Sequence, residues 1–153
     1  MSYSKFGFRW VMVNSIEYML RFRNPMARHT LYAYPDGRIT ATTFCELELT
    51  LTQLLQTVSW CQSPRVVSSG SGKEKTVGYN LELSDPGMEE TGWYRDIESI
   101  ATLLAGLVDK TRLTFVIGIH DSSSNISQDL HFIQSQDPDL KRLRAIIGVG
   151  EIE

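Results

Sequence analysis

Apolar and polar residues alternate along the first part of the chain. Residues 16–23 place large apolar side chains at every second position and mostly charged side chains between them, a period of two that is typical of a strand with one buried face. Residues 29–34 predict a second strand, residues 34–38 a tight Pro-Asp-Gly turn, and residues 39–49 a third strand. This pattern predicts an antiparallel β-meander.

Helical spacing follows the meander. Thr50 and Gln53 have the spacing of a capping box, and the leucine and valine residues that follow recur every three to four positions, which predicts a short helix. Residues 97–108 repeat this spacing and predict a second amphipathic helix. A third helix is expected to begin at Asp137 as its N-cap and to end at Gly148.

Further strands are expected between these helices. Residues 65–67 and 76–83 predict two strands joined by a loop rich in serine and glycine. Residues 113–119 are almost all apolar, as in a central strand covered on both faces, and residues 130–132 are its expected hairpin partner. The sequence therefore predicts an α+β fold, with a mainly antiparallel sheet built from hairpins and about three helices packed on one face.

Composition is compatible with one globular domain over residues 1–153. Hydrophobic residues make up 42% of the chain and charged residues 22%, which is ordinary for a folded protein. No apolar run is long enough for a secretory leader or a membrane span, so we expect a cytoplasmic location and no membrane partner. Cys45 and Cys61 are expected to be buried, reduced thiols at inward-facing positions.

Catalytic motifs are weak throughout the sequence. Gly72-Lys73 lacks the other residues of a phosphate-binding loop, and no serine lies in a nucleophile elbow. His120 and His131, with Asp121 and Asp129 nearby, would face each other if the last hairpin turns between them, which leaves a metal-dependent or acid–base enzyme as an alternative. We otherwise expect no catalytic residues and no cofactor.

Negative charge concentrates in one segment, although the net charge is only −3. There the acids Glu82, Asp85, Glu89, Glu90 and Asp96 surround the aromatic pair Trp93 and Tyr94. Exposed aromatic residues with charges of one sign around them are typical of a surface that docks on an oppositely charged protein. The alternative is that Trp93 fixes the start of the second helix to the core while the acids complement its dipole.

These features favour a non-enzymatic protein-binding module. The specific hypothesis is a small cytoplasmic inhibitor, comparable to the immunity protein of a toxin, that covers a basic partner surface such as a toxin or nuclease domain. A further alternative is nucleic-acid binding through the basic N-terminal meander, in which arginine residues accompany Tyr32 and Tyr34. The net negative charge of the chain disfavours that alternative.

Overall fold

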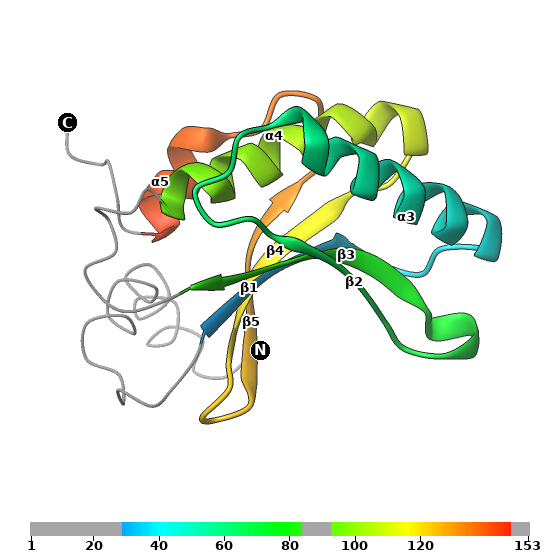
Figure 1. Ribbon diagram of the computed structural model, residues 1–153, viewed down its shortest axis with the longest axis horizontal. Coiled ribbons are helices and arrows are strands. Elements are labelled where there is room, and N and C mark those ends of the chain that lie inside the picture. Colours follow the sequence, from blue (N-terminus) through cyan, green and yellow to red (C-terminus); the bar gives the residue numbers. More distant parts are fainter. Residues whose placement is uncertain (1–28, 84–92, 148–153) are drawn as a thin grey trace.

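The protein folds around a five-stranded antiparallel sheet, and the computed structural model describes residues 29–83 and 93–147 (Figure 1). The strand order is β2-β3-β1-β4-β5. The strands are β1 (His29–Pro35), β2 (Arg65–Ser69), β3 (Thr76–Leu83), β4 (Phe115–Asp121) and β5 (Ile126–Ile133). The helices are α3 (Ala41–Leu54), α4 (Trp93–Thr111) and α5 (Leu140–Ile147), with short 3₁₀ turns at Leu55–Thr57 and Gly72–Glu74. The predicted α+β class is confirmed.

Two crossovers set the topology of the sheet. Helix α3 connects β1 to β2, and α4 connects β3 to β4, so each connection skips over one strand of opposite direction. The β-α-β-β-α-β order with strand order β2-β3-β1-β4 is the split β-α-β arrangement of ferredoxin-like folds. Strand β5 extends the sheet beyond β4 as a hairpin. Strand β1 therefore lies at the centre, with two strands on either side.

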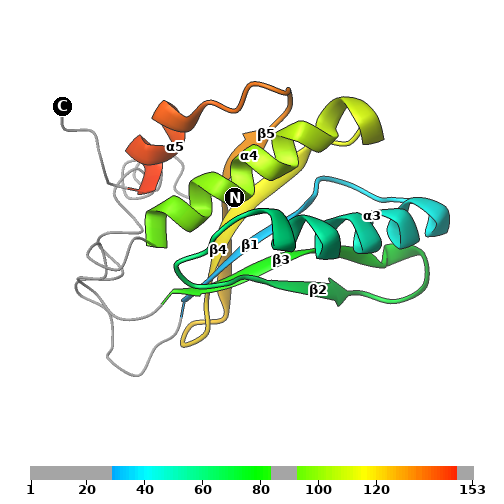
Figure 2. The same ribbon diagram turned by 45° about the horizontal axis from the view of Figure 1, so that its top comes forward.

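All three helices of the described residues lie on the same side of the sheet (Figures 1 and 2). Alternate residues of β1, β3 and β4 point toward them and are buried, because successive side chains of a strand point to opposite faces. The core contains Leu31, Leu81, Ile117 and Ile119 from the sheet and, among others, Leu47, Leu51, Ile100 and Leu104 from the helices. The buried Tyr79 hydroxyl donates a hydrogen bond of 2.7 Å to the carbonyl of Leu51, which satisfies the one polar atom that this side chain brings into the core.

The third strand of the predicted meander is wrong. Residues 41–54 form α3, which begins after Thr40, whose hydroxyl accepts a hydrogen bond of 3.1 Å from the Thr43 amide. The chain leaves β1 through Gly37, at φ +107°, and enters this helix instead of returning as a hairpin. The segment satisfies both periodicities, because apolar residues recur at alternate positions and also at the helical spacing of Phe44, Leu47 and Leu51, which are the buried ones.

The two cysteines also correct the sequence interpretation, since both thiols are free and exposed. The strand periodicity predicts an inward position for Cys45, but in a helix Cys45 follows Phe44 around the axis and leaves the buried face. Cys61 lies in the loop after α3, not in a helix.

The helix expected to start at the Thr50 capping box is wrong in its start, because Thr50 lies inside α3 and Thr40 is the N-cap. The other predicted elements within the described residues are confirmed, with ends that differ by a few residues. Strands occupy the regions expected near residues 29–34, 65–67, 76–83, 113–119 and 130–132, and helices those near residues 97–108 and 140–147. The N-cap of α5 is Asp139, whose carboxylate accepts a hydrogen bond of 3.0 Å from the Arg142 amide, and not Asp137. The predicted strand at residues 16–23 and the terminating Gly148 lie outside the described residues. Within the described part of the chain, no helix is both long and apolar enough to cross a membrane.

Candidate interaction surface on the open face of the sheet

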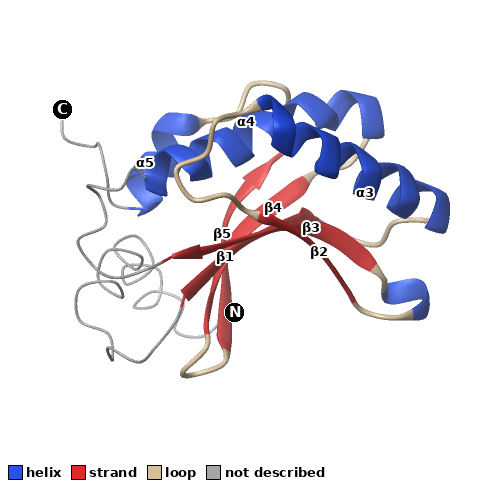
Figure 3. Cartoon of the chain, viewed as in Figure 1, coloured by secondary structure: helices blue, strands red, loops and turns tan. Residues whose placement is uncertain are grey.

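The second face of the sheet carries none of the described helices, as the separation of helices and strands in Figure 3 shows. We call it the open face. Its side chains are those that alternate with the core residues of each strand. The residues of this face include Arg65 and Val67 on β2, Gly78, Asn80 and Glu82 on β3, Thr30, Tyr32 and Tyr34 on β1, Val116, Gly118 and His120 on β4, and Ser127, Asp129 and Phe132 on β5.

Two tyrosines occupy the middle of the open face. Tyr32 and Tyr34 both project from β1, and their ring centroids are 6.3 Å apart with the planes inclined at 59°. A glycine lies under each ring: a Cβ added at Gly118 would come 2.2 Å from the Tyr32 hydroxyl oxygen, and one added at Gly78 would come 2.9 Å from Cγ of Tyr34. Because glycine leaves this space, both rings lie low on the sheet and are half-buried.

Hydrogen bonds fix both tyrosine hydroxyls. The Tyr32 hydroxyl donates to a carboxylate oxygen of Asp129 at 2.7 Å, and the Tyr34 hydroxyl donates to the side-chain carbonyl of Asn80 at 3.4 Å. Burial raises the pKa of both tyrosines above the ordinary value, and for Tyr32 the hydrogen bond to Asp129 and its charge raise the pKa further. Both hydroxyls are therefore hydrogen-bond donors, and these bonds hold the rings in place before any partner arrives.

Apolar and charged groups surround the tyrosines. Phe132 is 44% exposed and Val67 is half-buried. Arg65, Glu82 and Asp129 are exposed charges of both signs. An aromatic centre with a polar rim of mixed charge is the usual anatomy of a protein–protein interface.

The acidic segment predicted to dock a partner does not form one described surface. Glu82 is exposed at the end of β3 on the open face, whereas Asp85, Glu89 and Glu90 lie outside the described residues. Trp93 is the first residue of α4, and its side chain lies outside the described part of the structure, so neither interpretation of that indole is tested. Tyr94 is half-buried and packs against the core.

Asp96 turns inward, away from any partner. It is 1% exposed, and its two carboxylate oxygens accept hydrogen bonds from the backbone amides of Cys61 and Gln62 at 2.8 and 2.6 Å. Its inclusion in the docking set is therefore wrong. The side chains of one helical turn point in different directions, so neighbouring acids of a helix do not all face outward. Asp96 faces inward, where its carboxylate satisfies loop amides that would otherwise lack an acceptor.

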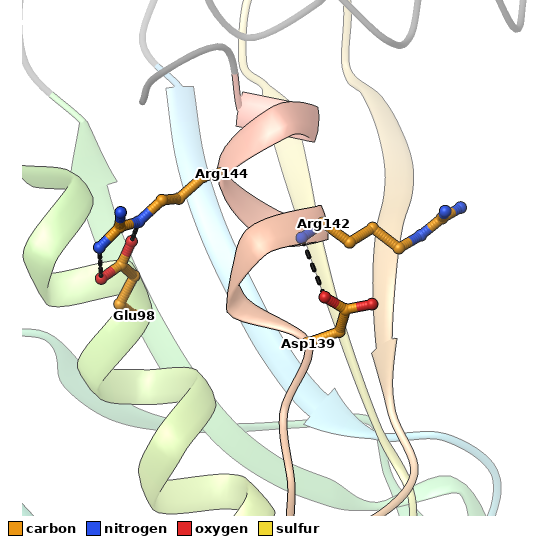
Figure 4. Close-up of polar contacts among 4 residues, drawn as sticks. All are labelled: Glu98, Asp139, Arg142 and Arg144. Atoms are coloured by element: carbon orange, nitrogen blue, oxygen red, sulfur yellow. Dashed lines mark hydrogen bonds and ion pairs between the residues drawn. The ribbon is translucent and has the colours of Figure 1, made fainter. Parts of the chain in front are cut away.

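Glu98, the next acid of α4, also interacts with a residue of the same chain. Glu98 forms an ion pair with Arg144 of α5, which links the two helices (Figure 4). The same view shows the Asp139 cap at the start of α5. The negative charge of the segment near α4 is thus partly used to hold α4 to its neighbours.

The two histidines of the enzyme alternative lie on opposite faces of the sheet. His131 pairs with Ile117, points toward the helices and is 7% exposed, while His120 lies on the open face with Nδ1 2.7 Å from the Ser127 hydroxyl oxygen. The β4–β5 register shifts between Ile117 and Gly118, and this β-bulge turns His131 to the face opposite to that of His120. A site shared by His120 and His131 is therefore wrong. The described residues contain no group of three side chains that could hold a metal ion.

A different histidine–carboxylate pair, which the sequence did not suggest, lies at the end of the sheet. The buried His29 has Nε2 4.0 Å from a carboxylate oxygen of Asp121, its register partner on β4. Partial burial opposes ionisation of Asp121, but hydrogen bonds from Ser123 and the nearby His29 hold the pKa of this carboxyl below its ordinary value. Only the strand register brings the two residues together, because they are far apart in the sequence.

A basic hollow lies where α3 begins, and it is lined by Arg38, Phe44, Cys45 and Lys73, with Lys75 at its side. Arg38 forms an ion pair of 2.8 Å with Glu74, and the Lys75 ammonium lies 4.7 Å from the centre of the Phe44 ring. Two of its three cations therefore already have partners. The Ser-Gly loop forms the tip between β2 and β3, as the mismatch with a phosphate-binding loop predicted.

Comparison with protein families, curated proteins and solved structures gave no match. The function of this protein is therefore inferred from the surfaces of the fold itself.

Proposed function

We propose that this chain is a non-enzymatic protein-binding module and that the open face of the sheet is its docking surface. The observation that carries the proposal is the placement of Tyr32, Tyr34 and Phe132 together on the sheet face that the described helices leave uncovered. Tyrosine is among the residues that contribute most to protein interfaces, because it offers a large rigid surface and a fixed hydrogen-bonding group.

The charges of the open face favour a protein over a nucleic acid. A nucleic-acid strand stacked on the tyrosines would bring its phosphates close to Asp129, whose carboxylate lies 2.7 Å from the Tyr32 hydroxyl. Surfaces that bind single strands instead surround their stacking rings with positive charge. Here Arg65 is accompanied by the acids Glu82 and Asp129.

The narrower hypothesis of an inhibitor that covers a basic toxin or nuclease surface stays a prediction. Its support is the exposed Glu82 together with the composition of the segment that follows it, without Asp96. The broader proposal does not depend on that segment.

A photo-crosslinking amino acid tests the proposal directly. We replace Phe132 by benzoylphenylalanine in the full-length chain, irradiate living cells and identify the adducts by mass spectrometry. The matched control carries the same amino acid at Leu49, which is 60% exposed on α3 and far from the open face. We expect a protein adduct from position 132 that is absent from position 49 and is reduced by Tyr34→Ser. An adduct pattern equal at both positions contradicts the proposal.

A further inference from the structure

We infer that the partner of the open face is a second copy of this chain, packed face to face about a twofold axis that runs along β1. This inference rests on the proposed function and identifies the protein that the docking surface binds. It follows from the way charges and apolar groups are distributed on either side of the central strand.

The strand registers align the relevant side chains in rows across the sheet. Arg65 pairs with Asn80, Asn80 with Tyr32, Tyr32 with Gly118, and Gly118 with Asp129. Arg65 and Asp129 thus lie in one row, each two strands from β1, at opposite edges of the face. One end of the row is positive and the other is negative.

The two neighbouring rows also carry different side chains on the two sides of β1. In one, Val67 lies on the β2 side and Phe132 on the β5 side, with Tyr34 and Val116 between them. In the other, Glu82 of β3 and His120 of β4 both pair with Thr30 of β1 and lie on either side of it.

A twofold rotation about an axis parallel to β1, between the two sheets, exchanges the two sides of the face. It places β2 of one copy over β5 of the other, and β3 over β4. Arg65 then faces Asp129 of the second copy, Val67 faces its Phe132, and Glu82 faces its His120. Each of these contacts occurs twice, as the symmetry of an isologous interface requires.

The alternative axis, which runs across the strands along the Arg65–Asp129 row, gives the opposite result. It places each strand over its own copy, so Arg65 faces Arg65 and Asp129 faces Asp129. The charge distribution therefore selects the axis along β1. Packed sheets lie about 10 Å apart, with their strands about 30° from parallel. The long side chain of arginine spans the distance between the sheets.

The size of the face sets the expected affinity. Five strands and three rows of side chains cover about 24 Å by 20 Å, or about 500 Å² for each copy. The total is near the lower limit of about 1,000 Å² for a specific interface, so we expect a dimer that dissociates at about micromolar concentration. The Arg65–Asp129 pairs lie at the rim, where charges select orientation more than they add affinity.

Charge exchange between the two edges tests both the partner and the axis. Sedimentation velocity of the full chain over a range of concentrations measures dimerisation of the wild type, Arg65→Asp and Asp129→Arg. Each variant alone puts like charges at both symmetric pairs, and we expect dimerisation about tenfold weaker. A mixture of the two variants regains opposite charges at both pairs, as does the double variant, so both are expected to dimerise nearly as well as the wild type. Lys110→Asp, at an exposed position at the end of α4, is the control and is expected to have no effect.

Several outcomes overturn the inference. A wild type that stays monomeric at about 1 mM, far above the expected dissociation range, excludes the dimer. Dimerisation that both variants leave unchanged uses another surface or the axis across the strands, and weakened dimerisation that the mixture does not rescue shows that positions 65 and 129 of the two copies do not face each other. The position-132 crosslink separates this failure from failure of the proposed function. An adduct with a different protein overturns the dimer but leaves the proposed docking function standing. A crosslink within one chain to residues 1–28, or a complex that purifies with nucleic acid, overturns both the dimer and the proposed function.

Discussion

Asp96 offers the sharpest test of the structure, because the sequence and the structure assign it different roles. The sequence predicts an exposed acid that binds a partner, whereas the structure places its carboxylate, 1% exposed, on the amides of Cys61 and Gln62. These two hydrogen bonds attach the loop before β2 to the first turns of α4. Asp96→Ala leaves both amides without this acceptor.

The magnitude follows from the two hydrogen bonds. A hydrogen bond to a charged group contributes about 1.5–3 kcal/mol, and an amide left unsatisfied in the interior costs a similar amount. The loop is only partly buried, so part of this loss is recovered by water, and we expect Asp96→Ala to lower the free energy of unfolding by about 3 kcal/mol. Asp96→Asn keeps one acceptor oxygen but turns an amide group toward the other donor, and we expect about half to two-thirds of that loss.

Urea unfolding followed by circular dichroism measures these differences. For a chain of this size the loss of about 3 kcal/mol lowers the thermal midpoint by about 6–12 °C. Glu98→Gln is the matched control, because it neutralises an acid of the same helix whose ion-pair partner Arg144 is half exposed; it is expected to cost less than about 1 kcal/mol. If Asp96→Ala is no more destabilising than Glu98→Gln, the carboxylate does not hold the loop and the reasoning is refuted.

Three further predictions concern other parts of the structure. Gly118→Ala is expected to destabilise the protein by about 2 kcal/mol or more, because the added Cβ would lie 2.2 Å from the Tyr32 hydroxyl oxygen. The control is Gly106→Ala on α4, where an added Cβ has nothing within 4 Å. In the same urea titration this control is expected to stabilise the protein by about 0.5–1 kcal/mol. Cys45 and Cys61 are both expected to react with a thiol reagent in the folded protein, and a reaction that requires denaturant would contradict their exposure. Burial, aided by a nearby arginine, lowers the pKa of His131, so the unfolded chain binds the proton more tightly than the folded one. The free energy of unfolding is therefore expected to be highest above about pH 7 and to fall as the pH drops toward about 5. His131→Leu is expected to flatten this slope, and an unchanged slope counts against the assignment.

The sequence predicted the elements whose pattern allows only one periodicity. Residues 76–83 and 97–108 carry unambiguous strand and helix patterns, and both elements are present in the structure. Residues 41–54 carry both patterns, and the local sequence could not decide between them. In the folded protein the helix buries Phe44, Leu47 and Leu51 against the sheet, so tertiary packing decided the conformation.

The candidate site was predictable only in part. The sequence predicts Tyr32 and Tyr34 as aromatic residues of one strand, and their spacing of two places them on one face. Their neighbours were not predictable, because Gly118, Asp129 and the rest of the open face come from strands that meet β1 only through the sheet order. The same dependence made the His120–His131 pair wrong, since a one-residue shift in register moves a side chain to the other face.

By itself, the sequence determined the class of fold, the alternation of strands with helices after residue 60, and the concentration of acids before α4. Tertiary structure alone decided that β1 lies at the centre of the sheet, that Asp96 turns inward, and that the open face carries opposite charges at its two edges. The physical reason is the range of the interactions. Periodicity and capping act over a few neighbouring residues, whereas strand order and burial depend on contacts between segments far apart in the chain.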